Sequence, residues 1–190
     1  MKKKLEKAFS ELTGKMKDKE LADKVIQVWV DCAKDGGWKS YEELCEMPFT
    51  LLTETDGVNL IEHTIAVTKA SIGIAEAMMT TYKKMPFNIN MDWLIAGGIL
   101  HDVGKLMETE KVDGKYRKSY AGQCERHPVS GCIAAAKAGL PIEIQNIIVT
   151  HAKEGEGAPK RIEGVFIHQA DFATFDPCVM KQKGLLIEKK

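Results

Sequence analysis

Arginine and long apolar runs are both scarce in this sequence, and each shortage excludes a class of protein. Three of the 190 residues are arginine, and acidic and basic residues balance to a formal net charge of zero. Long nucleic acid is bound largely through positive charge, so such a polymer is not an expected partner. No apolar run approaches the roughly 20 residues that cross a bilayer, so we expect no membrane insertion.

Paired cysteine motifs are also missing. The five cysteines are odd in number, and none is spaced Cys-x-x-Cys. This argues against a disulfide framework and favours reduced thiols that pack in the interior. The amino end, Met1 to Lys4, leads into a charged helix rather than a signal peptide. We therefore expect a cytoplasmic protein, and the sequence leaves open whether it forms a homo-oligomer.

Alternating strand patterns are nearly absent, and apolar residues recur instead at helical spacing. The exception is residues 112–116, where Asp113-Gly114 favours a tight hairpin. The expected fold is therefore an all-α helical bundle with at most one small hairpin. We expect helices over residues 2–16, 18–35, 40–47, 59–82, 90–102, from 127, 142–150 and 161–175, with Pro177 ending the last.

Histidines and carboxylates gather at the ends or inner faces of these expected helices. The candidate ligands are His63, His101, Asp102, His127, His151 and Asp171. Neutral imidazoles and carboxylates suit first-row transition metals. Six such groups exceed the needs of one tetrahedral ion, and Asp102 has two oxygens with which to bridge two ions. A single histidine is more often an ordinary surface or core residue, and we place His168 in that class, with support of the site as the lesser alternative.

The residues around Asp102 strengthen this interpretation. Residues 101–105 read His-Asp-Val-Gly-Lys and follow an apolar helix-compatible run. Gly104 suits a turn that needs backbone freedom, and Lys105 places a cation just beyond the carboxylate. Residues 127–131 read His-Pro-Val-Ser-Gly, and residues 166–171 form an apolar segment that ends in Ala-Asp.

In this order and context the residues resemble the HD-domain superfamily of metal-dependent hydrolases, over about residues 57–176. The resemblance implies that His63, His101, Asp102 and Asp171 hold one metal, and that Asp102 bridges to a second held by His127 and His151. It also implies that Lys105 contacts the substrate or an anionic intermediate, so that Asp102 and Lys105 are the catalytic candidates. We expect residues 1–56 to form an N-terminal helical extension packed on the core, residues 57–176 the HD domain, and residues 177–190 a C-terminal tail.

The family's dinuclear branches include phosphodiesterases, diadenosine tetraphosphate hydrolases and diiron oxygenases, so the resemblance leaves the reaction open. We expect one or two divalent transition metal ions (Mn, Fe, Co or Zn) and hydrolysis by a metal-activated water, with a small phosphate ester or nucleotide as the default substrate. The alternatives are hydrolysis of a non-phosphate substrate (a cyclic ketone or C–C ring opening), a diiron oxygenase, and a metal-binding module without catalysis. A Gly-Tyr-Pro element is absent, which disfavours cyclic-di-GMP.

Two further features bear on the substrate. Phosphate usually requires several cationic contacts, and Lys105 is accompanied in the sequence by Lys153, Lys160 and Arg161 as candidate additions. The polar segment 108–126 joins two ligand-bearing helices and is a candidate lid, with Tyr116, Arg117 and Tyr120 as candidate substrate contacts. An ordinary solvated loop is the alternative for that segment.

Overall fold

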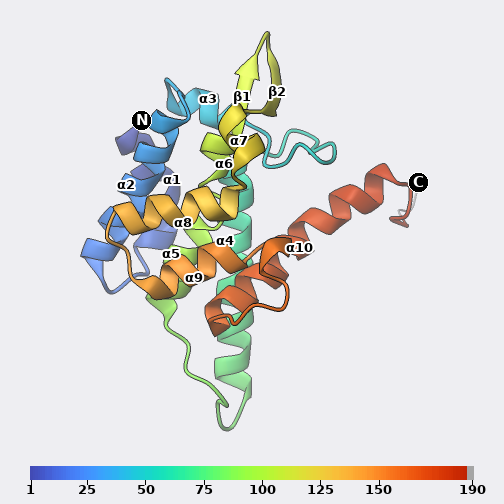
Figure 1. Cartoon of the computed structure of the whole chain (residues 1–190). Helices are drawn as coiled ribbons and strands as arrows, with labels where there is room; N and C mark the ends of the chain where they lie inside the picture. The colour runs from blue at the N-terminus through green and yellow to red at the C-terminus, as the bar shows by residue number, and fades with distance from the viewer. Residues whose placement is uncertain (188–190) are drawn as a thin grey trace.

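The computed structural model describes residues 1–187 and consists almost entirely of helices (Figure 1), which confirms the all-α prediction. The helices are α1 (Lys2–Thr13), α2 (Lys19–Asp35), α3 (Tyr41–Glu46), α4 (Leu60–Thr81), α5 (Met91–Leu100), α6 (Lys105–Glu108), α7 (Tyr120–Cys124), α8 (His127–Lys137), α9 (Ile142–Thr150), the 3₁₀ turn η1 (Lys153–Gly155) and α10 (Ile162–Gln182). Within the described residues, the only strands are β1 (Thr109–Val112) and β2 (Lys115–Lys118), which pair antiparallel as the expected hairpin.

Polar caps fix the start of two of the helices that carry the site, α4 and α5. Asn59 accepts a hydrogen bond from the backbone N–H of Glu62, and the Glu62 side chain accepts one from the backbone of Asn59. This reciprocal capping box satisfies two N–H groups that a helix start otherwise leaves unpaired. Asn90 likewise caps α5 through the N–H groups of Asp92 and Trp93. The caps set the point at which each helix enters the core.

Helix α10 runs further than the sequence predicted. Pro177 lies inside the helix rather than at its end, and the helix continues to Gln182. Proline's fixed φ is compatible with a helix, and what it removes is one N–H bond to the carbonyl four residues earlier. Ala173 and Pro177 are both exposed, so water can satisfy that carbonyl. The predicted tail therefore begins as a continuation of α10, and its residues 188–190 lie outside the described part of the chain.

The N-terminal helices pack directly against the helices that carry the site. The indole N–H of Trp29 donates to the carbonyl of Ile99 at 2.8 Å, and that of Trp38 donates to the carbonyl of Leu106 at 2.7 Å. Both tryptophans are buried in one continuous apolar core. They hold the chain just before His101 and just after Lys105. The division into an extension, a domain and a tail stays a prediction.

Figure 1 shows α4 as a long central helix, and α5 and α10 pack against it, with the C-terminal half of α10 projecting from the body. Among residues 1–187, no helix combines the length and the apolar character needed to cross a membrane.

Candidate metal centre

The six predicted ligands come from five separate helices and meet at one place. Each sits where a helix begins, ends or faces inward: His63 in the first turn of α4, His101 and Asp102 just after α5, His127 at the start of α8, His151 just after α9, and Asp171 within α10. Five of the six are buried, and Asp171 is half-buried. Because five of the candidate ligands lie near helix ends, side chains from separate helices can meet at one point.

Four of these residues form a first group. Nε2 of His63 lies 3.3 Å from Oδ2 of Asp102 and 3.1 Å from Oδ1 of Asp171. Nε2 of His101 lies 3.4 Å from the same Oδ2 of Asp102. Two ligand atoms that are each about 2.1 Å from one ion are roughly 3.0–3.4 Å apart in octahedral or tetrahedral geometry. The separations therefore match a shared ion.

The other oxygen of Asp102 faces a second group. Nε2 of His127 lies 3.2 Å from Oδ1 of Asp102, and Nε2 of His151 lies 3.5 Å from it. The ligand atoms of each group all lie within 4.8 Å of one another. Asp102 thus presents one oxygen to each group, which is the arrangement that a bridging carboxylate requires.

The hydrogen bonds leave the inward-facing atoms free. Nδ1 of His101 contacts the carbonyl of Gly98, and Nδ1 of His151 contacts that of Ile148, both at 2.7 Å. A carbonyl only accepts, so the proton sits on Nδ1 and the lone pair of Nε2 points inward. Within residues 1–187, the inward Nε2 atoms of His63, His101 and His151 and Oδ1 of Asp102 are buried without a hydrogen-bond partner. Buried polar atoms without partners are costly, so this set fits a cation.

The protonation states also favour a cation. Burial alone would raise the pKa of Asp102, yet that pKa lies well below its usual range because Lys105 and the surrounding imidazoles stabilise the carboxylate. Burial likewise opposes ionisation of Asp171, but the His63 imidazole, 3.1 Å away, lowers its pKa to about 2. Burial lowers the pKa of His127 to about 4. At neutral pH both carboxylates are therefore charged and His127 is a neutral imidazole, which is the ligand form.

Gly104 allows the two groups to meet, for a reason that differs from the expected one. Its φ of −63° and ψ of −20° are ordinary helical values, so the turn needs no unusual backbone freedom. A Cβ at this position would instead lie 2.1 Å from the carbonyl oxygen of His127 and 2.8 Å from the N–H nitrogen of Gly131. The absence of a side chain lets α8 approach the backbone beside Asp102.

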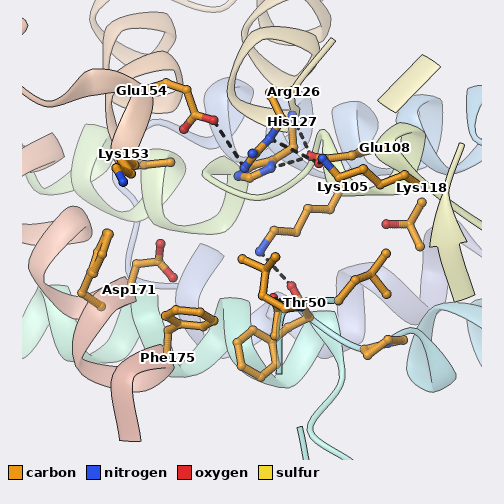
Figure 2. Close-up of a pocket in the computed structure, with 17 residues that line it drawn as sticks. Thr50, Lys105, Glu108, Lys118, Arg126, His127, Lys153, Glu154, Asp171 and Phe175 are labelled. Atoms are coloured by element: carbon orange, nitrogen blue, oxygen red, sulfur yellow. Dashed lines mark hydrogen bonds and ion pairs between the residues drawn. The ribbon is translucent and has the colours of Figure 1, made fainter. Parts of the chain in front are cut away.

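Lys105 lies between the cluster of candidate ligands and the pocket. Its Nζ donates to Oδ2 of Asp102 at 2.6 Å and to the carbonyl of Phe49 at 2.7 Å. The side chain is 17% exposed, so the ammonium is largely shielded from solvent. Figure 2 shows it extending into the middle of the pocket. The lysine compensates the charge of Asp102 and stands within reach of a molecule bound beside that carboxylate.

The cluster of candidate ligands opens into a pocket of about 440 Å³. Lys105, Asp171 and His127 contribute to its lining, whereas the other candidate ligands lie behind this surface. The rest of the wall includes three cations, Lys118, Arg126 and Lys153, and three aromatic side chains, Phe49, Phe172 and Phe175. It also includes the acidic Glu108 and Glu154 and several aliphatic and neutral polar side chains. In Figure 2, Arg126, Glu108 and Lys118 lie on one side of the pocket, with Asp171 and Phe175 on the opposite side. A molecule that is partly anionic and partly apolar matches these walls.

The candidate lid and the candidate cations are only partly where the sequence placed them. Segment 108–126 does line the pocket, but through Glu108, Thr109, Lys118 and Arg126. The three named contacts point elsewhere: Tyr116 stacks on Trp38, Arg117 pairs with Glu110, and Tyr120 is exposed to solvent. Side chains alternate along a strand, so Lys118 and Arg117 face opposite ways. Lys153 lines the pocket, whereas Lys160 donates to the carbonyl of Thr150 and Arg161 lies over Trp93.

His168 stays outside the ligand cluster, as expected. Its Nδ1 lies 2.5 Å from the backbone carbonyl of His151, and its ring packs against Phe172. It therefore supports the chain at His151 and presents no atom to either group. This contact agrees with the lesser alternative, a role in supporting the site.

Sequence reasoning missed two contributors to the site. Phe49 stacks on His63 with ring centroids 4.3 Å apart and accepts a hydrogen bond from Lys105. Glu108 is buried and accepts from both Nδ1 and the backbone N–H of His127. Phe49 lies in a stretch with no recognisable motif, and Glu108 is one of many acidic residues, so neither carries a signal in a single sequence.

Comparison with known proteins agrees with this geometry. The profile of the HD domain family matches residues 60–173, which is more than half of the chain. This chain belongs to the HD domain family. Dihydroneopterin 2',3'-cyclic phosphate phosphodiesterase of Methanocaldococcus jannaschii is 33% identical over 118 residues, covering 60% of this chain and 45% of that relative. The match thus spans less than half of the relative's length. No solved structure matches the chain significantly.

The family match covers all six candidate ligands and leaves α1, α2 and α3 outside. HD domains bind divalent metals, and the two groups of buried donors in this HD domain are able to hold such ions. The assignment of individual residues as ligands remains a prediction.

Proposed function

We propose that this HD domain is a metal-dependent phosphohydrolase that cleaves a phosphodiester in a small molecule with a flat, apolar portion. The observation that carries the proposal is the placement of the two donor groups beneath a pocket whose wall holds several cations. The relative's printed activity, on a cyclic phosphodiester of a pterin, supports the same chemistry. A small phosphate ester or nucleotide is therefore the expected substrate class.

His63, His101, Asp102 and Asp171 would hold one ion, and Asp102, His127 and His151 the other. The buried, unpartnered Nε2 and Oδ1 atoms make this donor set suitable for divalent transition metals. When bound, such ions supply an activated water and polarise a phosphoryl oxygen.

The pocket side chains bind and orient the substrate. Arg126 and Lys153 present donors that neutralise phosphate oxygens. Lys105, held at Asp102, faces the charge that develops during cleavage, and a fixed cation stabilises such charge. Phe172 and Phe175 provide flat apolar surface against which a ring can stack and from which water is excluded.

The pocket favours phosphate over the alternative substrates. A cyclic ketone or other neutral molecule carries no charge that could pair with Lys118, Arg126, Lys153 and Lys105. Lys118 and Arg126 share the single carboxylate of Glu108, and a phosphate group can accept charge-assisted hydrogen bonds from several such cations at once. The experiment that tests the proposal also distinguishes it from an oxygenase and from a metal-binding module without catalysis.

The test is an anaerobic assay of metal-free protein reloaded with Mn²⁺, Fe²⁺, Co²⁺ or Zn²⁺. The panel contains bis(p-nitrophenyl) phosphate, nucleoside 2',3'-cyclic phosphates, dihydroneopterin 2',3'-cyclic phosphate, phosphomonoesters and cyclic ketones. Phosphodiester cleavage with at least one ion, detected by phosphorus NMR, is the expected result. Asp102→Asn should abolish it, and Asp113→Asn, at the exposed hairpin turn, should leave it unchanged.

Two results would contradict the proposal. One is oxygen consumption with a cyclic ketone, in a parallel aerobic assay of the iron-loaded protein, while every phosphate ester stays intact. The other is full metal loading with no turnover of any member of the panel, which would indicate a binding module.

A further inference from the structure

Glu108 connects the second donor group to the cationic wall of the pocket. Its Oε2 lies 2.6 Å from Nδ1 of His127 and accepts the backbone N–H of the same residue at 2.8 Å. Its Oε1 lies 3.1 Å from Nζ of Lys118 and 3.3 Å from Nε of Arg126. The residue is 6% exposed, so its carboxylate is largely shielded from solvent, whereas the side chains of Lys118 and Arg126 are 42% and 45% exposed. One buried side chain thus contacts both a candidate ligand and two pocket cations.

His127 is held differently from the other candidate ligands. His101 and His151 donate from Nδ1 to backbone carbonyls, and Nδ1 of His63 lies 3.4 Å from the hydroxyl of Thr174. Only His127, among these four, has a carboxylate on its outer nitrogen. A carboxylate fixes the ring and its tautomer and makes the imidazole a stronger ligand than a carbonyl does.

His127 gains from the contacts with Glu108 because it lies at the pocket. His127 is the one candidate histidine that lines the pocket, so its ring borders the open space on one side. The other three histidines are enclosed by neighbouring helices. Glu108 compensates for this open side by bonding the ring and the backbone of the same residue. Helix α8 therefore starts with His127 locked in place relative to α6.

We propose that Glu108 is a positioning residue for the second ion. It holds the Nε2 lone pair of His127 toward Oδ1 of Asp102, and the first donor group does not depend on it. The inference rests on the metal centre of the proposed function and not on its substrate. Loss of the carboxylate should therefore weaken the second ion alone. The pairs with Lys118 and Arg126 keep Glu108 ionised and aligned at the same time.

The experiment is a titration of Zn²⁺ into the metal-free 190-residue chain in the presence of a competing chelator, without substrate. The unaltered chain should take up two ions. Glu108→Gln should bind the first ion as the unaltered chain does and the second about 10–100-fold more weakly. Glu154→Gln is the matched control, since Glu154 pairs with the same Arg126 at 3.3 Å from outside the cluster, and it should bind both ions normally.

Several outcomes would overturn the inference. One is that Glu108→Gln binds the second ion as tightly as the unaltered chain does. Another is that Glu108→Gln weakens the binding of both ions equally, and a third is that the unaltered chain binds only one ion. Failure of the proposed function would show itself separately, as missing turnover with normal metal uptake. If Glu108→Gln does not fold, nitrogen NMR of the unaltered metal-free chain decides, with the signals assigned through His127→Gln. A proton on Nδ1 of His127 supports the inference, and a proton on Nε2 refutes it.

Discussion

Gly104 and His127 approach so closely that a methyl group on Gly104 would come within 2.1 Å of the His127 carbonyl oxygen. The contact joins the segment that carries Asp102 to the start of α8. Neither backbone can yield cheaply, because Val103, beside Gly104, is fully buried and Ser130 and Gly131 are buried too. The distance between the two donor groups therefore depends on a missing side chain.

Gly104→Ala should separate the two donor groups. The added methyl must push α8 away, so we expect a loss of about 1–3 kcal/mol in the free energy of unfolding and a weaker second ion. Chemical denaturation and metal titration measure the two effects. Gly73→Ala, at an exposed helical position with open space around it, should instead be neutral or stabilising by up to about 1 kcal/mol. Normal stability and two tightly bound ions in the Gly104→Ala variant would contradict the packing argument.

The cysteines should differ sharply in reactivity. Burial, with nearby Asp35 and Asp31, raises the pKa of Cys32 to about 12, whereas Cys124 is exposed. The thiolate is the reactive form, so buried Cys32 should react very slowly near neutral pH. With a thiol reagent at pH 8 we expect Cys124 to react first and Cys32 only after unfolding. Cys124→Ser should remove the fast phase, and a fast phase that persists would disprove the assignment.

The candidate ligand cluster could be proposed from the sequence because several of its members carry local signals and because their order resembles that of HD domains. His101 follows an apolar helix, His127 precedes a proline that suits a first helical turn, and Asp171 ends an apolar segment. Helix caps such as Asn59 and Asn90 are likewise short-range hydrogen bonds between near neighbours in the chain. Local patterns of this kind are readable in one sequence, and they place the starts of α4 and α5 to within a residue.

The residues that sequence reasoning missed act through contacts between distant segments. Phe49 and His63 meet only after α3 and α4 have packed, and Glu108 reaches His127 across 19 positions. The end of α10 was misplaced because the cost of Pro177 depends on whether the freed carbonyl reaches water. Gly104 was recognised for the wrong reason, since its clash partner belongs to another helix. Tertiary packing decides each of these cases.

Lys105→Met should reduce turnover without removing metal. The substitution keeps the stem that packs near Phe49 and deletes the ammonium at 2.6 Å from Asp102. A preorganised cation of this kind is worth roughly 10²-fold or more in turnover. Elemental analysis and kcat on the cleaved phosphodiester measure the two effects, and Lys111→Met, whose ammonium pairs with exposed Glu46, is the control. Loss of metal together with activity would assign Lys105 a structural role.

The cations that line the pocket should increase the affinity for an anionic substrate. Arg126 and Lys153 line the pocket, whereas the hairpin tip at Asp113 does not. Arg126→Met should raise KM for an anionic substrate about 10-fold, since a charge-assisted hydrogen bond contributes roughly 1.5–3 kcal/mol. Removing the exposed tip residues should leave both KM and kcat unchanged. A larger effect from the tip than from Arg126 would restore the idea of a lid that closes through the hairpin.

Metal removal should lower thermal stability through the buried donors. Without an ion, Nε2 of His63 and Nε2 of His101 stay buried without partners, and like-charged Asp102 and Asp171 share one site. An ion present at about 100 times its Kd adds roughly 2.7 kcal/mol, which is about 5–10 °C in Tm for a chain of this size. Calorimetry with and without a chelator measures the shift.

The matched pair for this measurement is His63→Gln and His168→Gln. The first removes a candidate ligand of the first donor group, and we expect the chelator to lower its Tm by less than it lowers that of the unaltered chain, because the second group is retained. The second alters the one histidine outside both donor groups, so its protein should keep the metal-dependent shift of the unaltered chain. Equal shifts in the two variants would mean that the ion binds elsewhere, and the assignment of the buried cluster as the metal centre would then be wrong.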